Sequence, residues 1–253
     1  LINQILIKVH RLLIKYIYSK MVYKFIGVTN ETCDYLIKYE KVLREKVAFL
    51  SLGVDDSIFY KKKGSNTSLE NNSVLILQTG KLTEDKKPQW LAEACINLLL
   101  NGLNIKCMFV GGGSNIIKDY INQLFIKNGF KNKVKFIDFV QASELPNYYS
   151  KADICVYPDG TSLSAFEAAA CGTAVVMADY DASIDKVKNG LGLVYETGNI
   201  NDLSSKLSKL VNDIEYRNKI IRSSVKSVKQ NYTYKEISKK FLILCNQAVK
   251  QLN

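Results

Sequence analysis

From residue 73 onward, short apolar runs alternate with longer segments in which apolar residues recur at helical spacing. Most of the short runs are rich in β-branched and aromatic residues, which is typical of buried strands. They cover residues 74–80, 105–113, 134–140, 154–159, 173–179 and 192–196. Strands that alternate with helices are joined by right-handed crossovers and form a parallel sheet. The pattern therefore predicts an α/β fold with a doubly wound, Rossmann-like parallel sheet and helices on both faces.

The clearest helical segment spans residues 88–102. Pro88 suits the first turn, an apolar stripe follows at positions 90, 91, 94, 95 and 98, and Gly102 terminates the pattern. Two or three further helices are expected from Asn201 to the end of the chain, without another strand.

The first sixty residues have a different pattern. Residues 1–20 form an amphipathic helical pattern with Lys8, Arg11 and Lys15 on one face, which suits a helix docked on protein or lying on an anionic membrane. A strand, a helix and a second strand are predicted at 23–30, 31–41 and 47–55, and the polar segment 61–73 is the best linker candidate. Because the chain begins at Leu1 inside a helical pattern, we expect it to be a fragment of a longer chain.

Composition narrows the function only partly. The 253 residues are 47% hydrophobic, enough for a substantial core, and the net charge of +11 suits nucleic acid, an anionic membrane or phosphorylated substrates. The lysines are spread along the chain without a nucleic-acid recognition motif, so no nucleic acid is expected. The six cysteines show no zinc or redox spacing, and no apolar run is long and uncharged enough to span a bilayer.

Two predicted loops carry candidate binding residues, because ligands of such sheets lie beyond the carboxyl ends of the strands. In the first loop, Gly80 ends a strand and Lys81 and Lys86 precede a helix, an arrangement that suits a diphosphate. A solvated lysine cluster explains it equally well. The second loop contains three consecutive glycines, Gly111, Gly112 and Gly113. They allow either a close approach of the backbone to a ligand or a plain tight turn.

A third loop lies in "PDGTSLSAFEAAACGTAVV", residues 158–176. Asp159 ends the predicted strand, and Glu167 lies about one turn inside the following helix, so both carboxylates can face one pocket. The helix N-terminus consists of small or hydroxyl-bearing residues and one leucine: Thr161, Ser162, Leu163 and Ser164. Its backbone N–H groups can bind an anion. Since carboxylates repel phosphate, they must bind hydroxyls, which implies a ligand with a diphosphate and several hydroxyl groups.

From about Val22 to the C-terminus, the chain resembles the second half of retaining glycosyltransferases of family 4, which have the GT-B fold. Those enzymes carry a Gly-Arg…Lys loop, a glycine-rich loop and two acids eight positions apart running into "EAxACGxPVV". This chain has "GKLTEDK", "VGGG" and "DGTSLSAFEAAACGTAVV" in the same order. The resemblance implies that residues 1–60 are the remnant of an N-terminal acceptor domain with the interdomain segment. Residues 61–230 would be the donor domain, and residues 231–253 a helix packing back toward the N-terminal domain.

The resemblance implies a metal-independent transferase without a cofactor, which moves a sugar from a UDP or GDP type donor to a hydroxyl acceptor with retention. Lys81 and Lys86 would hold the diphosphate and stabilise charge that develops on it in the transition state. Glu167 would bind the ribose hydroxyls and Asp159 the hydroxyls of the donor sugar. The glycine loop, Gly80 and residues 161–164 would line the donor site, and Phe139 and Val140 would contact the base.

Several positions depart from the family pattern. Lys81 stands where arginine is commoner and lacks the two-pronged geometry of a guanidinium. Asp159 replaces a glutamate, which changes its reach, and Ala174 replaces a proline. His10, the sole histidine, lies in the amphipathic segment and is not expected to be catalytic. The triplet Asp179–Asp181 matches a metal-binding pattern of another glycosyltransferase fold, but we interpret it as a turn.

Two other functions remain open at this stage. A sugar-nucleotide epimerase shares the fold but lacks the "EAxACGxPVV" arrangement, and a non-catalytic subunit or binding module would use the basic surface. The acceptor is expected to be a saccharide or a lipid-linked glycan, as in polysaccharide and glycan biosynthesis. The enzyme is expected in the cytoplasm, with peripheral membrane contact and a partner chain supplying the N-terminal domain as further hypotheses.

Overall fold

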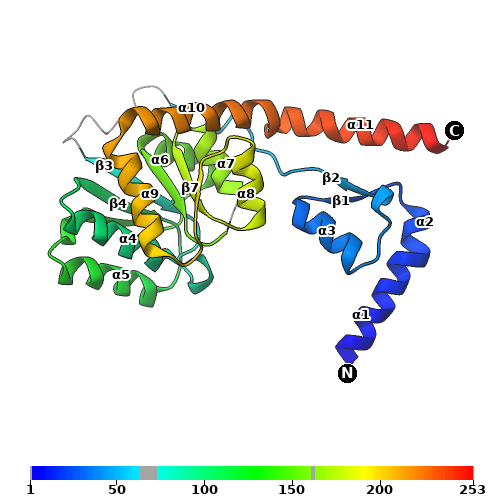
Figure 1. Cartoon of the computed structure of the whole chain (residues 1–253), viewed down its shortest axis with the longest axis horizontal. Helices are drawn as coiled ribbons and strands as arrows, with labels where there is room; N and C mark the ends of the chain where they lie inside the picture. The colour runs from blue at the N-terminus through cyan, green and yellow to red at the C-terminus, as the bar shows by residue number, and fades with distance from the viewer. Residues whose placement is uncertain (1, 63–72, 161–162, 253) are drawn as a thin grey trace. The chain divides into compact units, whose positions relative to one another are not determined.

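The computed structural model describes residues 2–62, 73–160 and 163–252 and contains two compact units (Figure 1). The first unit combines residues 1–53 with 234–253, and the second spans residues 54–233. The predicted linker lies mostly outside the described residues. In the second unit, Val54 pairs with Thr233, so the chain enters and leaves this unit at neighbouring positions. The functional division at 60/61 and 230/231 stays a prediction.

The first unit contains two parallel strands and several helices. In chain order these are α1 (Ile2–Leu13), a π-helical segment (Ile14–Tyr18), α2 (Ser19–Met21), β1 (Phe25–Gly27), α3 (Asn30–Lys38), a 3-10 turn (Arg44–Lys46), β2 (Val47–Phe49) and α11 (Tyr234–Leu252). The predicted strand–helix–strand order is confirmed. His10 lies 3.7 Å from the buried carboxylate of Glu40.

The second unit is built on a six-stranded parallel sheet in the order β5-β4-β3-β6-β7-β8. The strands are β3 (Val74–Thr79), β4 (Ile105–Val110), β5 (Val134–Ile137), β6 (Ile154–Tyr157), β7 (Ala174–Ala178) and β8 (Leu193–Tyr195). The helices are α4 (Pro88–Leu100), α5 (Asn115–Lys127), α6 (Leu145–Lys151), α7 (Leu163–Ala170), α8 (Asp181–Lys188), α9 (Ile200–Asn212) and α10 (Ile214–Asn231). Short 3-10 turns cover Glu84–Lys86, Lys131–Lys133 and Ala142–Glu144. The predicted doubly wound α/β fold is confirmed.

The alternation of side chains along the strands produces two apolar cores, one on each face of the sheet. On β6, Ile154 and Val156 face a core formed with α4, α5 and α9, whereas Cys155 and Tyr157 face a core formed with α6 and α7 (Figure 1). Both faces of a parallel sheet must be covered in this way, which explains why its strands appear in the sequence as continuous apolar runs.

Helix α4 shows why the sequence pattern was informative. Pro88 occupies its first turn, and Leu91, Ala94 and Cys95 are completely buried against the sheet. Gly102 follows with a φ of +79° and donates its N–H to the carbonyl of Leu99, which ends the helix. These features depend only on neighbouring residues, so the periodicity of the sequence predicts them.

Candidate functional site

All six strands are parallel, but the order in which successive strands are added to the sheet reverses between β3 and β6. The strands β4 and β5, which follow β3 along the chain, lie on one side of it, and β6, β7 and β8 lie on the other. In doubly wound proteins, the loops that follow the strands on either side of such a switch point diverge, and ligands bind in the crevice between them. The lysine loop follows β3 and the acidic loop follows β6, so both predicted binding loops lie where this crevice is expected.

Buried hydroxyl groups connect the end of β3 to Glu167. The Oγ1 of Thr79, the last residue of β3, lies 2.9 Å from the hydroxyl of Tyr149 on α6. That tyrosine donates a hydrogen bond of 3.3 Å to Oε2 of Glu167 on α7. Because Thr79 directly precedes Gly80 and Lys81, this chain of hydrogen bonds connects Glu167 to the strand end from which the lysine loop starts.

Glu167 is half-buried, which makes its charged form less favourable than that of an exposed carboxyl. Burial raises its pKa above the ordinary value, and hydrogen bonds from Tyr149 and Ser164 offset only part of that shift. Burial also raises the pKa of Tyr149 well above its usual range, so this hydroxyl stays protonated and acts as a donor. A fixed carboxylate that retains unused acceptor capacity can bind ligand hydroxyls.

The two predicted lysines lie on the loop after β3 with exposed side chains. Lys81 follows Gly80 directly, and Lys86 ends a 3-10 turn. The backbone carbonyl of Lys86 accepts a 3.4 Å hydrogen bond from Nε2 of Gln78. This bond ties the far end of the loop back to β3. The Nζ of Lys86 lies 3.7 Å from the carboxylate of Asp85, and among the described residues neither lysine pairs with Asp159 or Glu167.

The glycine loop packs against the lysine loop. Leu82 and Gly113 form a parallel bridge, and the N–H of Leu82 donates to the carbonyl of Gly112 at 2.9 Å. A Cβ on Gly111 would lie 2.0 Å from the carbonyl oxygen of Gly80, and one on Gly113 would lie 2.4 Å from that of Leu82. Two of the three glycines are therefore required for contact between two loops of the protein, whatever their role toward a ligand.

Two predicted base contacts follow β5, and their environments differ. The side chain of Phe139 is 73% exposed, and its Cβ lies 3.9 Å from the position that a Cβ on Gly112 would occupy. Val140 packs against the core that contains α6 and α7. Phe139 therefore offers a free aromatic face beside the glycine loop, which is a suitable surface for stacking a planar ring.

Asp159 lies just beyond β6, and its hydrogen-bond partner differs from that of Glu167. Its Oδ1 accepts a 2.7 Å hydrogen bond from the hydroxyl of Tyr180, which precedes α8. This bond, together with the nearby charge, raises the pKa of Tyr180. The second carboxylate oxygen remains available on a half-exposed side chain, so Asp159 can bind a polar group of a ligand.

The remaining predicted residues lie at the start of α7. The backbone carbonyl of Ser164 accepts a 2.7 Å hydrogen bond from the hydroxyl of Tyr157. Leu163 packs against the core that contains α6 and α7. Thr161 and Ser162 lie outside the described residues. Their predicted contacts with a ligand therefore stay predictions.

The triplet at 179–181 has a structural role at its first position. Asp179 accepts hydrogen bonds from the backbone N–H of Thr197 at 2.9 Å and from its hydroxyl at 2.6 Å, which lowers the pKa of this carboxyl. Asp181 lies in the first turn of α8. Within the described ranges, no three acidic, histidine or cysteine side chains converge as metal ligands do.

Three residues near the crevice were not predicted from the sequence: Thr79, Tyr149 and Tyr180. Tyr149 lies on a short helix 18 residues before its partner Glu167, and no local pattern connects them. Tyr180 lies in the middle of the triplet that the sequence predicts to be a turn, and nothing in that pattern indicates its hydrogen bond to Asp159. A polar residue at the end of a buried strand, as at Thr79, is the one local signal that could have been used.

Comparison with known proteins identifies the family of this chain. The model of the family "Glycosyl transferases group 1" matches residues 61–227. The uncharacterized glycosyltransferase MJ1607 of Methanocaldococcus jannaschii is 25% identical over 83% of this chain and 59% of its own length. The capsular polysaccharide biosynthesis glycosyltransferase CapM of Staphylococcus aureus is 24% identical over 89% of this chain and 62% of its own length. The chain thus spans about three fifths of these two relatives.

Among solved structures, Anabaena HepE in complex with UDP superposes with a TM-score of 0.77 over 89% of this chain and 64% of its own. At 18% identity, this likeness concerns the fold alone. The family model, in contrast, matches more than half of the sequence and includes the lysine, glycine and acidic loops. The chain therefore belongs to the glycosyl transferases group 1 family.

Proposed function

We propose that residues 54–233 bind the nucleotide diphosphate sugar donor of a retaining family 4 glycosyltransferase. The observation that carries this proposal is the position of Glu167, which Tyr149 and Thr79 connect to the strand end where the lysine loop begins. A carboxylate for hydroxyls and ammonium groups for phosphates then border one crevice. The likeness in fold to HepE, a protein solved in complex with UDP, supports a nucleotide ligand.

In the proposed reaction, the bond between the anomeric carbon and the leaving phosphate oxygen breaks, and a bond to the acceptor oxygen forms on the same face. The acceptor hydroxyl gives its proton to the leaving diphosphate. The limiting step places negative charge on the leaving diphosphate, which Lys81 and Lys86 would stabilise. Glu167 would orient the ribose and Asp159 the sugar, while Phe139 would stack on the base. No metal or cofactor is assigned a role, and the donor itself carries the reactive group.

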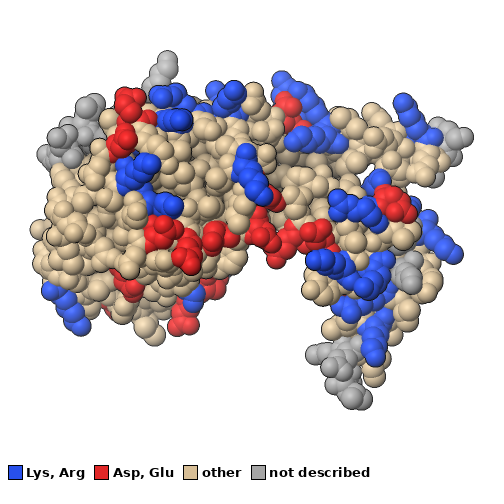
Figure 2. All heavy atoms as spheres, in the orientation of Figure 1, with Lys and Arg blue, Asp and Glu red and all other residues tan. Residues whose placement is uncertain are grey.

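The acceptor is proposed to be a saccharide or lipid-linked hydroxyl, in line with the similarity to CapM, a glycosyltransferase of capsular polysaccharide biosynthesis. Acceptor binding and complete transfer are proposals for a whole protein, since the chain covers only part of its relatives. The comparisons do not favour the epimerase or the non-catalytic module. On the face that Figure 2 shows, lysine and arginine side chains are spread among acidic ones and do not form one stripe, which does not favour nucleic acid.

Across the described helices, none is long and apolar enough to cross a bilayer. A cytoplasmic location, peripheral membrane contact and a partner chain remain proposals.

Replacing the loop lysines tests the diphosphate contact. Lys81→Ala and Lys86→Ala should each weaken binding of UDP about tenfold, because each removes one charge-assisted contact of roughly 1.5 kcal/mol. Isothermal titration of the full chain with UDP, GDP and ADP, and with UMP for comparison, measures the effect. The preference for UDP over UMP should decline in both variants.

The matched control is Lys127→Ala, which removes an exposed lysine in the last turn of α5, away from both loops. It should leave all affinities unchanged. If the wild-type chain binds none of the three diphosphates, the proposed donor site is wrong. If the loop variants keep the UDP affinity of the wild type, the diphosphate lies elsewhere.

Tyr180→Phe tests the role proposed for Asp159. Loss of the 2.7 Å hydrogen bond frees the carboxylate, so affinity for a UDP-sugar should fall about threefold relative to UDP itself, as expected for one neutral donor. Titrations with UDP and with a panel of UDP-sugars give this ratio. An equal change for UDP and for every UDP-sugar would contradict a contact between Asp159 and the sugar.

A further inference from the structure

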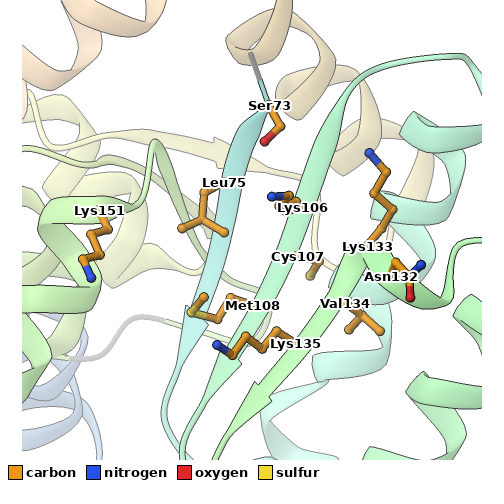
Figure 3. Close-up of a pocket in the computed structure, with 10 residues that line it drawn as sticks. All are labelled: Ser73, Leu75, Lys106, Cys107, Met108, Asn132, Lys133, Val134, Lys135 and Lys151. Atoms are coloured by element: carbon orange, nitrogen blue, oxygen red, sulfur yellow. The ribbon is translucent and has the colours of Figure 1, made fainter. Parts of the chain in front are cut away.

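A hollow of about 420 Å³ opens at the amino-terminal ends of β3, β4 and β5 (Figure 3). It lies at the opposite end of the sheet from the crevice described above. From Leu75 in this hollow to Gly80 at the crevice, β3 rises by about 16 Å at roughly 3.3 Å per residue. The hollow is therefore a separate place on the second unit and takes no part in the proposed donor site.

Among the residues that the structure describes, one face of the sheet is incompletely covered at this end. In the strand register, Leu75 lies opposite Lys106, and Met108 lies opposite Lys135, so these four side chains share one face. Helices α4 and α5 cover the other face, where Cys107 and Phe109 are buried. On the shared face, Leu75 and Met108 are half-buried, and both lysines are exposed.

Lysine within β4 is unusual, because β4 is an interior strand of a parallel sheet. Such strands normally carry apolar residues on both faces. Here Lys106 and Met108 alternate with buried Cys107 on the same strand, and Lys135 extends the basic surface onto β5. The sheet thus presents two cations beside a partly apolar floor at a place where a helix would usually pack.

The charged residues among the described part of the lining are all lysines: Lys106, Lys133, Lys135 and Lys151 (Figure 3). Lys133 donates to the side-chain oxygen of Asn104 at 3.0 Å, and within the described part of the chain neither Lys106 nor Lys135 has an ion pair or a side-chain hydrogen bond. The carboxylate beside Leu75, Asp153, is already paired with Arg217 at 3.7 Å.

We propose that this hollow binds a phosphate-bearing anion at a site independent of the nucleotide donor. Clustered ammonium groups repel one another, and a phosphate between them would replace repulsion by attraction, which the apolar floor strengthens by lowering the local dielectric. The volume is within the range of small-molecule sites. Leu75 and Met108 would contact the carbon part of the ligand, which is either a phosphorylated small molecule or the headgroup of a phospholipid.

The methionine methyl groups give a direct test, because the chain has only Met21, Met108 and Met177. In the full chain labelled with ¹³C at these methyl groups, the Met108 signal should shift saturably on titration with inorganic pyrophosphate. The signal of Met177, which is completely buried, should stay in place. Met108→Leu identifies the signal. A titration with vesicles of phosphatidylcholine, with and without phosphatidylglycerol, distinguishes a lipid headgroup from a free phosphate.

Two paired variants separate this site from the proposed donor site. The double variant Lys106→Gln with Lys135→Gln should lower the anion affinity measured at the Met108 signal at least tenfold and leave UDP binding unchanged. The double variant Lys106→Arg with Lys135→Arg should retain the anion affinity. Lys81→Ala with Lys86→Ala should leave the response intact. The proposal is overturned if neither pyrophosphate nor anionic vesicles shift Met108, or if the glutamine variant responds like the wild type.

Discussion

Glu167→Ala is expected to weaken UDP binding about a hundredfold. In the proposed donor site, this carboxylate accepts two ribose hydroxyls, and two hydrogen bonds to a charged group contribute roughly 3 kcal/mol together. Glu167→Gln should show a smaller loss, because the amide oxygen still accepts a hydrogen bond but carries no charge. Isothermal titration of the full chain with UDP provides the measurement.

Glu167→Gln should also raise the melting temperature at neutral pH. Burial raises the pKa of Glu167, so the folded chain binds the proton more tightly than the unfolded chain does. The charged form therefore lowers stability above that pKa, and this loss is relieved as pH falls through it. The advantage of the glutamine variant should shrink at acidic pH, which thermal unfolding across a pH series can measure.

Glu93→Gln is the matched control for these experiments. Glu93 on α4 accepts a 3.4 Å hydrogen bond from the hydroxyl of Tyr120, much as Glu167 accepts one of 3.3 Å from Tyr149. Glu93 lies outside the crevice. This control should change UDP affinity by less than about twofold. Equal effects of Glu93→Gln and Glu167→Gln on UDP binding would refute the role proposed for Glu167.

Gly111→Ala is expected to reduce the free energy of unfolding by about 3 kcal/mol, since a strained backbone and a steric clash would act together. Gly111 has a φ of +146°, and its added Cβ would lie 2.0 Å from a backbone oxygen of Gly80, which no side-chain rotation can relieve. Urea unfolding followed by circular dichroism measures the change in midpoint at an unchanged slope.

The neighbouring Gly112→Ala provides the control. Its added Cβ would meet only the Cβ of Phe139 at 3.9 Å, an ordinary contact, and Gly112 does not have a positive φ. We expect its stability to change by less than about 1 kcal/mol. Similar losses in both variants would mean that the lysine and glycine loops do not pack as closely as described.

The same glycines show the limit of prediction from sequence. The triplet was recognised, but its neighbours in sequence do not reveal that Gly111 packs against Gly80. That contact joins residues 31 positions apart and arises because β3 and β4 are adjacent in the sheet. A turn and a ligand loop were therefore both open interpretations, and tertiary contact supplied a third reason for the glycines.

The sequence by itself determined the strands of the second unit, their alternation with helices, the fold class and the order of the three candidate loops. Apolar periodicity and capping residues act over a few positions, so they can be read locally. Only the tertiary structure decided that β3 and β6 are neighbours, that Tyr149 bonds Glu167 and Tyr180 bonds Asp159, and that lysines gather on an open face of the sheet. These contacts depend on strand order and on which face each helix covers, and residues far apart in the chain establish both.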